Sequence, residues 1–164
     1  MEKEIRRYRN SLVTDGIGIV YFVIWSIIKI VLNVVKESSD FIESFRKTIS
    51  DSDERSETAI IIFLIIAFVV FVTFILFLQL YIGLSAYKEG INGKKGNIYL
   101  VAAVIMMLIN CLGMTLYFIP EYIADEISFS NIVAFFIDLT TVLILLDMIH
   151  SAIMSRKLSK QLEK

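Results

Sequence analysis

Four long apolar runs dominate this sequence, and each is long enough to cross a lipid bilayer as a helix. They cover approximately residues 12–35, 59–86, 98–119 and 132–154. About 20 apolar residues suffice for one crossing, and a helix satisfies its own backbone hydrogen bonds in hydrocarbon. The sequence therefore predicts an all-α membrane protein, an antiparallel four-helix transmembrane bundle. Because four crossings use most of the 164 residues, we expect a single domain over residues 1–164.

Lysine and arginine are distributed unevenly among the segments between the apolar runs. The N-terminal segment, the loop between the second and third runs and the C-terminal segment are rich in them. The loop over residues 120–131 has none, and the first loop has four against seven acids. Basic residues accumulate on the cytoplasmic side of short loops. We therefore expect a multi-pass protein of the plasma (cytoplasmic) membrane with both termini in the cytoplasm.

The first outer loop has its own helical pattern. Asp40 followed by Glu43 fits a capping box, in which two side chains bond the free backbone groups at a helix start. Three apolar residues then recur at four-residue spacing: Phe41, Phe45 and Ile49. This pattern predicts a short amphipathic helix on the outer membrane surface. A second short helix is expected in the third loop, from Pro120 through Ile127.

Two charged residues inside the apolar runs, Lys29 and Asp138, are expected at a similar depth in the bilayer. Such charges are costly in hydrocarbon, so they usually face other helices or water. With the first helix running outward and the fourth inward, Lys29 and Asp138 both lie in the outer half of the bilayer. An ion pair between them would hold the two helices together, and we favour this structural meaning. The alternative is a hydrated path lined by Lys29, Asp138 and Asn110 of the third run.

A second polar group lies near the inner surface, where Asp147 and His150 are three residues apart and Asp15 has a similar depth. Such residues can bind a metal or sense pH. Two neighbouring ligands do not make a metal site, however, and a histidine at a helix end is usually solvated. We therefore predict an inner polar cluster of Asp15, Asp147 and His150 without a metal ion.

The sequence carries no pattern that predicts catalysis. A nucleophile elbow, a zincin motif, a phosphate loop and a nucleotide fingerprint are all missing from it. We therefore expect no enzyme activity, no cofactor and no nucleic-acid partner. The expected function is a non-catalytic interaction, accessory or regulatory role, with the lipid bilayer and another membrane protein or a second copy as partners. The alternative is an oligomeric channel or transporter subunit.

Overall fold

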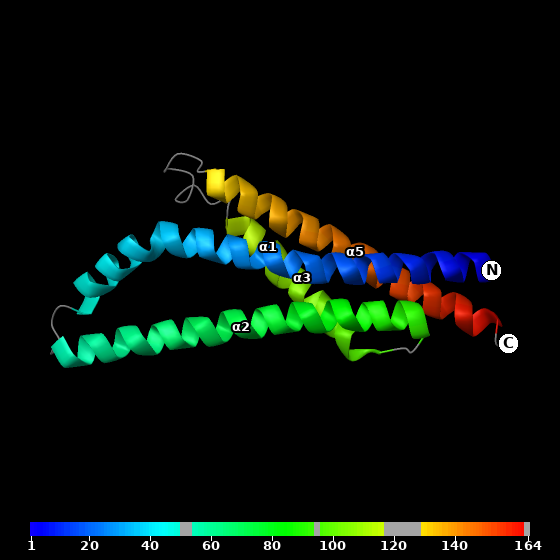
Figure 1. Cartoon of the computed structure of the whole chain (residues 1–164), viewed down its shortest axis with the longest axis horizontal. Helices are drawn as coiled ribbons and strands as arrows, with labels where there is room; N and C mark the ends of the chain where they lie inside the picture. The colour runs from blue at the N-terminus through cyan, green and yellow to red at the C-terminus, as the bar shows by residue number, and fades with distance from the viewer. Residues whose placement is uncertain (50–53, 94–95, 117–128, 163–164) are drawn as a thin grey trace.

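The computed structural model describes residues 1–49, 54–93, 96–116 and 129–162, and these residues form four helices (Figure 1). The helices are α1 (Glu2–Ile49), α2 (Glu54–Asn92), α3 (Ile98–Leu116) and α5 (Phe129–Leu162). Each contains a stretch that is long and apolar enough to cross a membrane. The described residues thus have the make-up of a small, all-helical membrane protein.

The helices extend beyond the apolar runs. α1 begins at Glu2 and continues past residue 35 to Ile49. The expectation of a separate amphipathic helix in the first loop was therefore wrong, because these residues are helical but continue α1 without a break. No glycine or proline occurs in residues 36–49 to end the helix. Figure 1 shows the last part of α1 angled away from the rest. The second expected short helix, over residues 120–127, lies outside the described residues.

α2 ends in a glycine cap. Gly93 has φ of +66°, a left-handed conformation that glycine adopts without steric cost. Its backbone N–H donates to the carbonyl oxygen of Glu89 at 2.8 Å. A Cβ on Gly93 would lie 2.7 Å from Nη2 of Arg9. The start of α1 therefore packs over the end of α2.

The core lies in the half of the molecule that contains both chain ends, which lie at the same end in Figure 1. α1 packs along α2 and along α5, and α3 packs against α5 and less extensively against α2. The residues of the core cluster come from all four helices: Leu12, Ile19, Ile82, Ala86, Tyr99, Ala102, Ala103, Met106, Leu145, Met148 and Ala152. This packing fixes the positions of the polar side chains described below.

Glycines allow α1 and α2 to touch through their backbones. A Cβ on Gly16 would lie 2.7 Å from the carbonyl oxygen of Gly83 and 2.8 Å from the backbone nitrogen of Tyr87. A Cβ on Gly83 would lie 2.8 Å from the carbonyl oxygen of Gly16. Small residues permit such close approach between membrane helices. The α1–α2 contact therefore depends on glycine, which has no Cβ, at positions 16 and 83.

We expect Gly16→Ala to push α1 and α2 apart, because the atoms it would meet belong to the backbone and cannot rotate away. The free energy of unfolding should fall by about 1–3 kcal/mol, the usual cost of overpacking. Gly18→Ala is the matched control, since its Cβ would meet only the Ile144 side chain, at 3.6 Å. Denaturation curves in detergent measure both variants. Equal stability of the two would contradict a backbone contact at Gly16.

Candidate functional site

An ion pair between α1 and α5 lies within the apolar part of the helices. Nζ of Lys29 donates to both carboxylate oxygens of Asp138, each at 2.6 Å. The side chains are 22 % and 5 % exposed, respectively. In surroundings of low dielectric, a paired charge is strongly favoured over one left alone. This contact therefore ties the middle of α1 to α5.

Asn110 has a different hydrogen-bond partner from Lys29 and Asp138. Its Nδ2 donates to the carbonyl oxygen of Met106, one turn earlier in α3, at 2.8 Å. The hydrogen bond is thus internal to α3. Of the three side chains considered for a hydrated path, the structure brings together Lys29 and Asp138.

The two aspartates near the chain ends meet around a serine of α1. Oγ of Ser11 lies 2.9 Å from Oδ2 of Asp147 and 3.3 Å from Oδ2 of Asp15. His150 instead packs against the ring of Tyr8, edge to face, with 6.0 Å between ring centroids. Among the described residues, no group of three His, Cys, Asp or Glu side chains is placed to hold a metal ion. The structure therefore brings Asp15 and Asp147 together around Ser11, and the neighbour of His150 is an aromatic ring.

A second ion pair, between α2 and α5, was not anticipated from the sequence. Nε and Nη2 of Arg156 each donate to a different carboxylate oxygen of Glu89, both at 2.6 Å. The Arg156 and Glu89 side chains are 16 % and 5 % exposed. Such a planar fork-to-carboxylate contact is among the strongest polar contacts in proteins. It joins the last turns of α2 to α5.

Three further residues complete this contact. Oε2 of Glu89 also accepts hydrogen bonds from the Tyr99 hydroxyl at 2.8 Å and the Gly96 N–H at 3.2 Å. Arg156 donates to the Asn97 side-chain oxygen at 2.8 Å and to the Gly96 carbonyl oxygen at 2.6 Å. The guanidinium also lies 6.0 Å from the centroid of the Tyr99 ring. We call these five residues the Glu89–Arg156 network. It connects α2, the start of α3 and α5.

A sequence signal for this network did exist. Glu89 is the single acid in the basic segment over residues 87–97. An acid in such a segment is informative because it opposes the local charge. The basic C-terminal segment, which includes Arg156, predicts only the orientation of the chain. The pairing itself depends on contacts between helices far apart in the chain.

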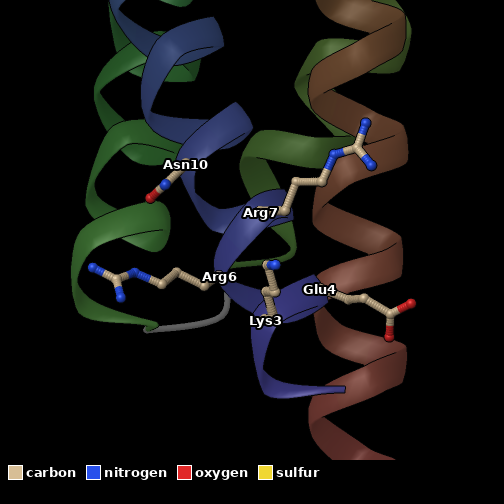
Figure 2. A pocket seen from close by; sticks show the side chains of 5 residues that line it. All are labelled: Lys3, Glu4, Arg6, Arg7 and Asn10. Atoms are coloured by element: carbon tan, nitrogen blue, oxygen red, sulfur yellow. The ribbon is translucent and has the colours of Figure 1, made fainter.

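The start of α1 carries an exposed polar hollow rather than a closed pocket. Its lining residues are Lys3, Glu4, Arg6, Arg7 and Asn10. Figure 2 shows the side chains of Arg6 and Glu4 pointing to opposite sides of α1. These two charged groups therefore do not converge on a common point in the hollow.

The two ion pairs share one design. In each, both carboxylate oxygens of a buried acid contact a cation on another helix, and α5 contributes one partner to each pair. This geometry suits the holding of helices in fixed positions. Comparison of the chain with protein-family models, with curated proteins and with solved structures found no match.

Proposed function

We propose that this protein is a multi-pass component of the plasma membrane with a non-catalytic interaction, accessory or regulatory role. In this proposal its helices form an antiparallel bundle, and both termini lie in the cytoplasm. The distribution of lysine and arginine supports that orientation. The Lys29–Asp138 contact is the observation that most favours a non-catalytic role over a conducting one.

In the alternative role, Lys29 and Asp138 would line a hydrated path, so water or an ion would have to reach them. Asp138 is 5 % exposed and is in direct contact with Lys29. Direct pairing at this burial favours a structural use of the two charges. By holding α1 against α5, the Lys29–Asp138 pair supports a rigid bundle whose outer surface a partner protein could bind.

The first half of α2 supports an interaction role. Its large apolar side chains are exposed on every side of the helix: Ile62, Phe63, Ile65, Ile66, Phe68, Val69, Val70, Phe71 and Phe74. A helix packed in its own bundle normally buries one face. This stretch thus leaves room for a transmembrane helix of another membrane protein. Its single hydroxyl between residues 62 and 77, on Thr73, bonds to the carbonyl oxygen of Val69, which suits an apolar partner.

Photo-crosslinking from two exposed apolar positions tests the proposal. A photoreactive amino acid at Phe74 of α2 is expected to give a discrete adduct with another membrane protein. At Leu143 of α5 it should label lipid alone. The two side chains are 63 % and 57 % exposed, so the positions are matched in access to the membrane.

Labelling of lipid alone at both positions would contradict the interaction role. The alternative, an oligomeric channel or transporter subunit using Lys29, Asn110 and Asp138, makes a different prediction. It requires proton or potassium flux from liposomes that contain the purified chain, and loss of this flux in Asp138→Asn. That result would replace the proposed function.

A further inference from the structure

One face of α3 is buried near the start of the helix and less buried near its end. Tyr99, Ala103 and Met106 on this face are buried in the core. One turn further, Asn110 is only partly buried. A Cβ on Gly113, three residues later, would meet no atom within 4 Å. The face that forms core at residues 99–106 is therefore only partly covered at residues 110–113, as far as the described residues go.

The opening exposes a polar group inside an apolar stretch. Nδ2 of Asn110 uses one hydrogen on the carbonyl oxygen of Met106. Within the described part of the chain, no donor reaches its Oδ1 and no acceptor reaches the second hydrogen of Nδ2. The flanking Leu108, Ile109 and Leu112 are exposed, as residues facing lipid would be. Hydrocarbon offers no hydrogen bonds, so the remaining donor and acceptor of this amide carry a desolvation cost where they face lipid.

We propose that this face of α3 binds the same face of a second copy of the chain, around Asn110 and Gly113. The free groups of Asn110 are one donor and one acceptor, so two such amides related by a two-fold axis satisfy each other. Asparagine side chains act in this way between membrane helices, and glycine allows the backbones to approach. A two-fold interface uses one patch on both partners, which fits a self-complementary amide. The proposal goes beyond the interaction role above, because α3 and the first half of α2 are separate surfaces.

Disulfide trapping tests the geometry of this interface in purified, full-length protein in bilayers. In a Cys111→Ser background, Met114→Cys places a thiol one turn from Asn110 on the same face. Both copies insert in the same direction, so equivalent residues meet, and Met114→Cys should give a covalent dimer under mild oxidation. Leu112→Cys points to the opposite side of α3 and should remain monomeric. A dimer that forms equally from both positions would overturn the proposed interface.

Dilution of fluorescently labelled protein in lipid measures the contribution of the amide. Asn110→Ala is expected to raise the dissociation constant of the dimer about tenfold, as removal of interhelical hydrogen bonds does in membranes. Asn110→Gln keeps a donor and an acceptor and should retain most of the affinity. A melting temperature equal to that of the wild type establishes that Asn110→Ala is folded. A folded Asn110→Ala that dimerises as the wild type does, or a wild-type chain that stays monomeric, would also overturn the proposal.

Discussion

Arg156→Ala should lower the free energy of unfolding by about 3–5 kcal/mol, the usual cost of removing one partner from a buried ion pair. The carboxylate of Glu89 would remain at 5 % exposure without its cation. The Asn97 side chain and the Gly96 carbonyl oxygen would also lose a donor. Denaturation in detergent measures the loss. Lys157→Ala is the matched control, because it removes the same charge from an exposed neighbour on α5.

A conservative variant separates charge from geometry at this site. Arg156→Lys keeps the positive charge but cannot contact both oxygens of Glu89 with a planar fork. We expect its stability to lie between that of the wild type and that of Arg156→Ala. If Arg156→Ala and Lys157→Ala were equally stable, the Glu89–Arg156 network would not hold the helices together.

Lys29→Ala is expected to cost about 3 kcal/mol, the lower end of the range for broken buried pairs. The reason is that the Asp138 carboxyl, which is 5 % exposed, would lose the Lys29 ammonium that both of its oxygens contact. Joint replacement, Lys29→Ala with Asp138→Asn, also removes the carboxylate that faced Lys29 and should restore much of the loss. The measurement is a melting curve in detergent for the two single variants and the double variant.

The double variant decides the meaning of the contact. Restored stability indicates that the single variant suffers because the Asp138 carboxylate has lost the cation of Lys29. Without any restoration, the damage in Lys29→Ala would come from the loss of the lysine stem rather than from the ion pair. The structural role that we propose for Lys29 and Asp138 would then be wrong.

Hydropathy predicted the number of long apolar helices but not where the helices end. The apolar run at residues 12–35 marks the stretch suited to lipid, whereas α1 extends from Glu2 to Ile49. Backbone hydrogen bonds continue wherever the residues tolerate helix, so polar turns are added at both ends. The end of α2 has a local cause, the left-handed Gly93. α5 likewise continues beyond the apolar run at residues 132–154, to Leu162.

The polar contacts were predictable only in part. Lys29 and Asp138 could be matched because they lie at a similar depth in the bilayer. This depth follows from the position of each residue in its helix once the helix directions are assumed. The contact between Gly16 and Gly83 depends on which faces of α1 and α2 meet, and hydropathy does not carry that information. Pairing of Glu89 with Arg156 also requires the position of α5 relative to the loop before α3. Such contacts emerge from packing rather than from composition.

The participation of α5 in both ion pairs has a consequence for biosynthesis. Arg156 follows Glu89 by 67 residues, and Asp138 follows Lys29 by 109. In a nascent chain, Lys29 within its apolar stretch and Glu89 at the end of α2 therefore have no contact with Asp138 and Arg156 until α5 has been made. A ribosome that stops before residue 129 would release a product that lacks both of these ion pairs, a form suited to recognition by membrane quality-control proteases.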